Sequence, residues 1–410
     1  MKKLKAFRYR LYPKEEQINL FLRTAGACRF IYNLCLEQRR LEWHRSNPRR
    51  LTAYDQIKAL PELKAEAEWL RDVPNHPLQQ AIMDLARSFK NFFEGRADYP
   101  KFHKRGQKDS FRFPDPKQFK CEEKRIFLPK AGWVEWVRHR PLEGKMKTAT
   151  VSREADCWYV SIQCEIEEME PASNRGPAVG IDIGIAKPLA LSNGQVIYLP
   201  RTSDKERRRL AALQRRASRR RKDSKNRRKA QMAVTRYYAK LARRRKNAAH
   251  EASTMIAKTH GFIVVEDLRV RNMTASAAGT IAEPGRNVPA KSGLNRSILD
   301  IAPGQIYQML SYKAPWYGSR FADVPAPHTS QECNACLYID AANRREQSSF
   351  LCVSCGHRED ADLNASKNIL RRGLATGGLP GMACESNHAR GRKQEQRAAR
   401  PGSSVIHGRE

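Results

Sequence analysis

The 410-residue sequence has no apolar run near the roughly 18 residues that a membrane-spanning helix needs. Residues 1–13 are basic but lack the apolar segment of a secretory signal peptide. Acidic residues are scarce, with 43 Asp and Glu against 77 Lys and Arg. The 40% of hydrophobic residues are nevertheless enough to fill buried cores. We therefore exclude membrane, collagen-like and wholly disordered classes, and expect a soluble cytoplasmic protein of several domains.

The net charge of +34 points to a polyanionic partner, and more than half of it lies in residues 201–246. This stretch has 21 Lys and Arg against three acids, and its sparse apolar stripes predict two long basic helices joined by a turn at residues 222–226. A solvated charged face is the alternative, but so many cations repel one another unless an anion neutralises them. The candidate nucleic-acid contacts here are Arg215, Arg216, Arg219, Arg220, Arg221, Arg227 and Arg228.

Changes in pattern along the chain predict its division into domains. A first strand at residues 1–12 and a set of short strands within residues 97–172 form one expected domain, with a helical insertion at residues 13–96. Among these strands, residues 155–156 predict a hairpin turn. After a linker rich in Pro, Gly and Ser, residues 173–370 form a second domain. The Gly- and Arg-rich residues 371–410 are expected to be a flexible tail.

Three acidic residues stand at the ends of predicted elements in the second domain. Residues 179–185 alternate strictly and predict a strand that continues through residues 189–191, with Asp182 between two glycines that leave open space around it. Glu266 ends a run typical of a buried parallel strand, and Asp362 stands at the start of a helix. Singly, these acids could be a turn residue, a surface residue and a helix N-cap.

Together, the three acids follow the layout of an RNase H-like α/β sheet, with Asp on the first strand, Glu after a later central strand and Asp on a late helix. Three converging carboxylates can hold two divalent ions roughly 3.5–4 Å apart, a site suited to phosphodiester cleavage. Hard oxygen ligands and a phosphate substrate favour magnesium. We therefore predict catalytic, magnesium-binding roles for Asp182, Glu266 and Asp362.

Four cysteines have the spacing of a zinc ribbon: Cys333 and Cys336, then Cys352 and Cys355 after 15 residues. Four thiolates would close a tetrahedral site, so we predict one structural zinc ion in a ribbon at residues 328–358. His357 is a less favoured alternative ligand. The other six cysteines have no ligand spacing.

Several sequence segments, in the same order along the chain, resemble those of the TnpB family. This family comprises the RNA-guided nucleases of bacterial insertion sequences and is related to compact type V CRISPR effectors. The resemblance extends from the first strand to about residue 370 and is carried by Phe7-Arg-Tyr-Arg-Leu-Tyr-Pro13, Arg29-Phe-Ile-Tyr-Asn33, Tyr99-Pro-Lys-Phe102, Leu128-Pro-Lys-Ala-Gly-Trp133, Gly180-Ile-Asp-Ile-Gly184, Val265-Glu-Asp-Leu268, Tyr312-Lys-Ala-Pro-Trp-Tyr-Gly318, Thr329-Ser-Gln-Glu-Cys333 and Ala361-Asp-Leu-Asn-Ala365. It departs from the family at Leu337, where a glycine is usual after the knuckle. Asp360 also precedes Asp362 by two, which leaves a second register for the third acid.

The resemblance implies a multidomain protein. Residues 1–12 and 97–172 would be a β-barrel wedge domain, residues 13–96 a helical recognition domain, and residues 173–370 a RuvC-like nuclease domain containing the basic hairpin at 201–260. It implies a guide RNA from the transposon end, a double-stranded DNA target with a short adjacent motif, and a prokaryotic, nucleoid-associated, monomeric ribonucleoprotein. Asn75, His76 and Gln79 are candidates for reading that motif, with ordinary helix entry and surface as the alternative.

Three alternative functions remain open. A non-cleaving RNA-guided regulator of the same fold should have lost one of the three acids, and this chain retains all of them. A transposase of the Asp-Asp-Glu type has a different order of acids. A plain RNA-binding zinc-ribbon protein explains the charge and the cysteines but gives the carboxylates no role.

Overall fold

The computed structural model describes residues 2–46, 51–107, 109–167, 169–280 and 282–376. Residues 377–410 of the predicted tail lie outside this part. The described chain divides into two compact units, one of residues 2–13, 121–126 and 134–376 and the other of residues 14–120 and 127–133. Among the helices of the described residues, none has the length and apolar character to span a membrane.

The second unit is mainly helical. It contains α1 (Glu15–Trp43), α2 (Ala53–Lys58), α3 (Leu60–Glu66), the 3₁₀ helix η1 (Glu68–Arg71), α4 (Asn75–Phe93), β2 (Ser110–Phe113) and the 3₁₀ helix η2 (Pro116–Gln118). Helix α1 begins with a capping box, in which the Gln17 side chain accepts from the Lys14 N–H, and has two acids in its first turn. Its buried face packs on α4, where the Cys28 thiol donates to the Pro77 carbonyl.

A seven-stranded sheet has the order β2-β6-β7-β1-β5-β4-β3. Its remaining strands are β1 (Lys2–Tyr12), β3 (Lys120–Cys121), β4 (Arg125–Leu128), β5 (Gly132–Val137), β6 (Lys145–Glu154) and β7 (Cys157–Glu167). The predicted hairpin at residues 155–156 is confirmed, because β6 and β7 pair antiparallel around Ala155, whose φ is 57°. Strand β1 pairs antiparallel with both β5 and β7.

A five-stranded sheet carries two of the three predicted acids, Asp182 and Glu266, and has the order β10-β9-β8-β11-β12. Its strands are β8 (Ala178–Asp182), β9 (Leu189–Leu191), β10 (Val196–Ile197), β11 (Phe262–Glu266) and β12 (Arg320–Val324). Strands β10, β9 and β8 pair antiparallel, whereas β8, β11 and β12 run parallel. The prediction of one strand continuing from residue 179 through residue 191 is wrong. The strand ends at Asp182, and after a loop β9 returns antiparallel to β8, which restores backbone pairing at this edge.

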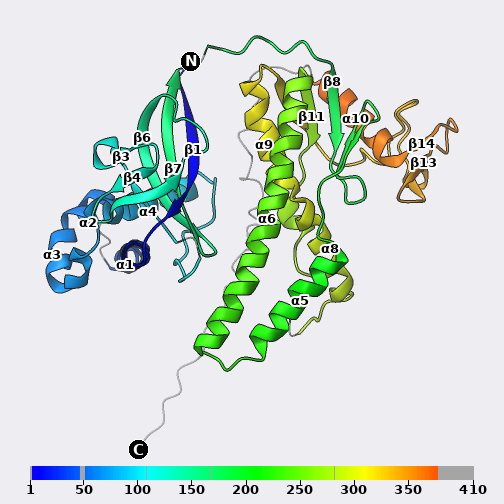
Figure 1. Cartoon of the computed structure of the whole chain (residues 1–410). Helices are drawn as coiled ribbons and strands as arrows, with labels where there is room; N and C mark the ends of the chain where they lie inside the picture. The colour runs from blue at the N-terminus through cyan, green and yellow to red at the C-terminus, as the bar shows by residue number, and fades with distance from the viewer. Residues whose placement is uncertain (1, 47–50, 108, 168, 281, 377–410) are drawn as a thin grey trace, which may run out of the picture. The chain divides into compact units, whose positions relative to one another are not determined.

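Helices cover this sheet. The basic hairpin consists of α5 (Asp204–Ser218) and α6 (Lys225–Thr259). The helices that follow are α7 (Val270–Met273), α8 (Val288–Ile301), α9 (Pro303–Trp316), the 3₁₀ helix η3 (Ala341–Arg344) and α10 (Ala361–Ala375). Between η3 and α10 lie two short strands, β13 (Ser349–Leu351) and β14 (Arg358–Asp360). Figure 1 shows α5 beside the N-terminal half of α6, in the predicted antiparallel pair. The turn lies earlier than predicted, because α5 ends at Ser218, Ser224 caps α6 and Lys225 is already helical.

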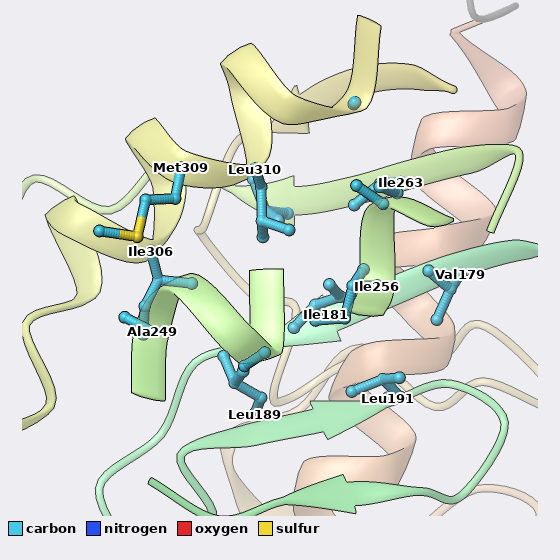
Figure 2. Close-up of a cluster of buried hydrophobic side chains, with 14 of the residues drawn as sticks. Val179, Ile181, Leu189, Leu191, Ala249, Ile256, Ile263, Ile306, Met309 and Leu310 are labelled. Atoms are coloured by element: carbon cyan, nitrogen blue, oxygen red, sulfur yellow. The ribbon is translucent and has the colours of Figure 1, made fainter. Parts of the chain in front are cut away.

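The apolar core of this domain lies between the sheet and two helices. Strand residues Val179 and Ile181 pack with Ile256 of α6 and Leu310 of α9, all almost completely buried (Figure 2). The opposite face packs on α10. A Cβ on Gly180 would lie 2.2 Å from the Ser366 carbonyl oxygen, and one on Gly373 would lie 2.5 Å from Val264. These two glycines therefore let α10 approach β8 and β11 closely.

Candidate active site and metal centre

Asp182 and Glu266 end neighbouring parallel strands, so both lie at the carboxyl edge of the five-stranded sheet. Asp182 is partly buried and Glu266 is 8% exposed. The Thr329 hydroxyl donates to Oε1 of Glu266 and holds this carboxylate in one orientation. Our expectation of open space around Asp182 is wrong on the Gly180 side, because α10 fills that space.

Asp360, not Asp362, is the N-cap of α10. Its Oδ1 accepts from the N–H groups of Asp362 and Leu363 at 3.2 Å, and its Oδ2 pairs with Lys187. Asp360 therefore has both carboxylate oxygens engaged, and the reading of Asp362 as a helix cap is wrong. Asp362 stands in the first turn of α10 and is partly buried.

The three predicted acids influence one another electrostatically. Burial, together with the negative charges of Glu266 and Asp362, raises the pKa of Asp182 to about 7. Burial also raises the pKa of Glu266, against the lowering effect of the Thr329 hydrogen bond and of two arginines. The pKa of Asp362 is raised by burial and by the neighbouring Asp360. Carboxylates whose ionisation is disfavoured in this way create a local demand for positive charge.

This donor set fits magnesium, because it offers hard oxygen atoms from three chain segments at one sheet edge. Among the described residues, only the four ribbon cysteines have ligand atoms that all lie within 4.8 Å of one another. The three carboxylates, all among the described residues, do not form such a compact cluster.

Arg344 is a site residue that the sequence reasoning missed. It ends η3 in the ribbon, and its guanidinium lies 3.5 Å from Oδ1 of Asp362. Its charge also lowers the pKa of Asp182 and Glu266 against the effect of burial. Arg344 lies 78 or more residues beyond Asp182 and Glu266 in the chain, and its position between the cysteine pairs was the one available signal.

The four cysteines form the predicted cluster. The Cys333–Cys355 sulfurs lie 3.7 Å apart and the Cys336–Cys352 sulfurs 3.5 Å apart. Tetrahedral zinc with Zn–S bonds of about 2.3 Å requires sulfurs about 3.8 Å apart, so the cluster fits one zinc ion. Burial opposes ionisation of Cys352, but backbone N–H groups of Cys355 and Ser354 and neighbouring thiols outweigh it and lower its pKa to about 6.

His357 does not join this cluster. Its Nε2 lies 3.3 Å from the Asn334 amide nitrogen and 3.6 Å from the Glu359 carboxylate. At the first knuckle, Leu337 has a φ of 65°, in the left-handed region that favours glycine, and its N–H donates to the Cys333 carbonyl. The second knuckle has Gly356 at the matching place, with a φ of 71°. The departure at Leu337 thus keeps the turn at a cost in backbone strain.

Polar side chains bind the ribbon to α10. Asn364 is fully buried, accepts from the backbone and side-chain nitrogens of Asn334 and donates to the Glu332 carbonyl. The Glu332 carboxylate pairs with Arg371 and Arg372 of α10. Because Thr329 and Arg344 belong to the same segment, the ribbon contributes directly to the carboxylate site.

The basic hairpin presents its arginines to solvent. All seven candidates are exposed except Arg227, which is half-buried and donates to the Arg220 carbonyl. Two open hollows of about 590 and 260 Å³ lie along the helices and share Arg216 and Arg220. The larger hollow is lined by Ala212, Arg215, Arg216, Arg219 and Arg220. Phosphate groups suit such a surface.

The three candidates for motif reading lie at the start of α4. Asn75 and His76 are exposed, Gln79 is partly buried, and the Asn75 side chain accepts from Lys64 at 2.7 Å. Pro74 occupies the N-cap position. Their exposure suits contact with a partner and equally suits an ordinary helix start, so their role stays a prediction.

Family models match three parts of the chain. One described as a probable transposase matches residues 161–277, one described as "Cas12f1-like, TNB domain" matches residues 304–369, and one described as a helix-turn-helix domain matches residues 1–47. The described residues of this last segment form β1 and the single long helix α1 in the structure, without a helix-turn-helix.

The full chain is also similar to curated proteins. It is 42% identical over 398 residues to an Escherichia coli K12 protein named "Putative RNA-guided DNA endonuclease InsQ", which covers 97% of this chain and 98% of the relative. A Streptomyces pristinaespiralis protein with the same functional name is 33% identical and covers 90% of each chain. The fold is similar to that in the cryo-EM structure of a Cas12f1–sgRNA–target DNA complex, with a TM-score of 0.51 and 14% identity over 90% of this chain and 98% of the other.

The identity to InsQ extends over nearly the whole of both chains. The TNB-domain match covers all four zinc-ribbon cysteines. The predicted resemblance is thereby confirmed: this chain belongs to the TnpB family.

Proposed function

We propose that this protein is an RNA-guided DNA endonuclease that uses a guide RNA from the transposon end and a short target-adjacent motif. The observation that carries the proposal is the meeting of Asp182, Glu266 and Asp362 at one sheet edge, within a chain aligned over nearly its full length with a relative named as such a nuclease. The strand order and directions of the five-stranded sheet support an RNase H-like, RuvC-type nuclease domain.

The three carboxylates would hold two magnesium ions. Such ions, when bound, supply an activated water and stabilise the leaving oxygen of the cleaved phosphodiester. Thr329 keeps Glu266 oriented, and Asp360 fixes the first turn of α10, from which Asp362 extends. Arg344 brings positive charge to the edge where a scissile phosphate would lie.

The remaining parts would bind and read nucleic acid. Base pairing with the guide would read the target sequence, while the basic hairpin α5–α6 would hold the phosphate backbone without reading bases. We assign residues 1–12 and 97–172 to a wedge domain and residues 13–96 to a recognition domain. Asn75, His76 and Gln79 are the proposed contacts with the adjacent motif. One zinc ion would hold the ribbon in shape.

The test is cleavage by the ribonucleoprotein. The protein is purified with its flanking transposon-end RNA and incubated with magnesium and a plasmid library that carries the guide match beside randomised flanks. We expect cleavage that requires RNA, match, metal and one flank motif. An Asp182→Ala variant should lose cleavage and keep RNA-dependent DNA binding.

The alternatives predict other results. RNA-dependent binding without cleavage by the unaltered protein would favour the regulator. Joining of DNA ends without a guide would favour the Asp-Asp-Glu-type transposase. One matching family model is described as a probable transposase.

A further inference from the structure

One ion pair joins two of the segments that carry the proposed catalytic acids. Lys187 lies in the loop between β8 and β9, five residues after Asp182. Its ammonium group pairs with Oδ2 of Asp360, directly before α10. The two side chains are 27% and 35% exposed, so the pair is partly shielded from solvent.

The Asp360 carboxylate has a second set of contacts. Its other oxygen accepts from the N–H groups of Asp362 and Leu363, both at 3.2 Å. A single carboxylate therefore binds the β8–β9 loop on one side and the first turn of α10 on the other. Among the described contacts, this is the direct link between the loop that leaves Asp182 and the turn that carries Asp362.

The loop and the helix have separate anchors elsewhere. Arg201, which precedes α5, donates to the Ala186 carbonyl at 3.1 Å. The Asn364, Arg371 and Arg372 side chains tie α10 to the segment that leads into the ribbon. The sheet edge, the ribbon and the packing of α10 on β8 would thus keep their places without Lys187, whereas the Lys187–Asp360 pair joins the β8–β9 loop to the first turn of α10.

We propose that Lys187 and Asp360 are a positioning pair that sets the spacing of Asp182 and Asp362 for divalent cations, without contacting the cations themselves. The inference rests on the proposed function and adds residues that determine its metal affinity. Groups that orient metal ligands typically change metal affinity by about 10- to 100-fold when altered.

Electrostatics and positioning predict opposite effects here. Lys187 is a cation beside an acidic cluster, so its charge alone disfavours a second cation. Removing that charge without moving any ligand would tighten divalent binding. If Lys187 instead positions the carboxylates, Lys187→Met weakens divalent binding, although the variant is more negative.

The experiment measures Mn²⁺ binding to the full-length ribonucleoprotein by electron paramagnetic resonance, alongside cleavage as a function of Mg²⁺ concentration. We expect Lys187→Met to weaken Mn²⁺ affinity about tenfold. Cleavage should fall at low Mg²⁺ and recover at high Mg²⁺, with RNA-dependent DNA binding unchanged. Asp360→Asn keeps an acceptor for the helix N–H groups and should match Lys187→Met, and the double variant should be no weaker than either. Lys187→Arg should restore affinity.

The matched control is Lys5→Met, which breaks a partly exposed ion pair with Glu143 in the seven-stranded sheet and should leave Mn²⁺ affinity unchanged. Unchanged or tighter Mn²⁺ binding by Lys187→Met would overturn the proposal. If Lys187→Met does not fold, Asp360→Asn and Lys187→Arg decide by the same measure. Because Mn²⁺ binding is read without DNA cleavage, an unaltered protein that binds Mn²⁺ but never cleaves would refute the proposed function alone.

Discussion

At the scale of single residues, the carboxyl of Asp182 is held in an environment that disfavours its charge. Its pKa of about 7 in the fold lies above the roughly 3.9 of an unfolded chain. The folded state therefore binds the proton more tightly than the unfolded state. The resulting stabilisation is present below pH 4 and is lost as the pH rises through 7. A site built for cations thus weakens the protein when they are absent.

Asp182→Asn should therefore raise the free energy of unfolding in divalent-free buffer. We expect its advantage over the unaltered protein to grow by about 1 to 3 kcal/mol between pH 5 and pH 8. Urea denaturation in resin-treated buffer measures this, since a chelator would also remove zinc. Asp223→Asn, in the exposed turn before α6, is the control. If the difference in free energy of unfolding between Asp182→Asn and the unaltered protein does not change with pH, burial and charge repulsion do not raise the pKa of Asp182.

Arg344 gives a second prediction at this scale. Arg344→Gln removes a positive charge 3.5 Å from Asp362 and should lower the maximal cleavage rate at saturating magnesium by tenfold or more, on the order of 1.4 kcal/mol. DNA binding should persist, because the hairpin arginines are unchanged. Arg345→Gln alters the next, exposed arginine and should leave the rate intact. Equal losses in the two variants would instead indicate a general effect of ribbon charge.

At the scale of elements, the ribbon and α10 behave as one unit. Thr329, Asn334 and Arg344 connect the cysteine cluster to Glu266, α10 and Asp362. We expect a mercurial that displaces zinc to release about one zinc ion per chain. Faster amide hydrogen exchange should follow in residues 329–363, while β1 and β7 stay protected. Acceleration confined to the two knuckles would show that α10 holds its end of the site without the metal.

Much of this architecture could be predicted from local patterns. The run 262–265 predicted β11, the turn at residues 155–156 predicted the β6–β7 hairpin, and the cysteine spacing predicted the cluster. The end of β8 was not predictable in the same way, because the apolar alternation continues past Asp182 into the loop. Ile183 and Ile185 still pack against the core from that loop, so burial preserved the strand-like pattern without strand pairing.

The contents of the site were only partly predictable. Asp182, Glu266 and Asp362 stand at element ends, where sequence signals are strong. The positions of Arg344, Thr329 and Lys187 depend on how the ribbon and a loop fold back onto the sheet edge. Such contacts join residues 18 to 173 positions apart, and no local period encodes them.

At the scale of the whole molecule, the charge of +34 opposes compactness until a polyanion binds. Residues 201–246 concentrate this repulsion, although Glu206 and Asp300 offset part of it by pairing with Arg244 and Arg245. Raising the salt from about 0.1 M to about 1 M shortens the Debye length from about 10 Å to about 3 Å. Salt should therefore stabilise the RNA-free protein and weaken its complex with RNA.

Thermal melting tests whether salt stabilises the RNA-free protein and destabilises its complex with RNA. The RNA-free protein should melt a few degrees higher at high salt, and the ribonucleoprotein should melt lower, because salt competes with its phosphate contacts. Replacing Arg219, Arg220 and Arg221 with Gln should reduce both effects. It should also flatten the slope of log affinity against log salt by roughly 2 to 3, for three lost phosphate contacts. An unchanged slope in the triple variant would indicate that the nucleic acid does not contact these three arginines. Their charge would then need another partner.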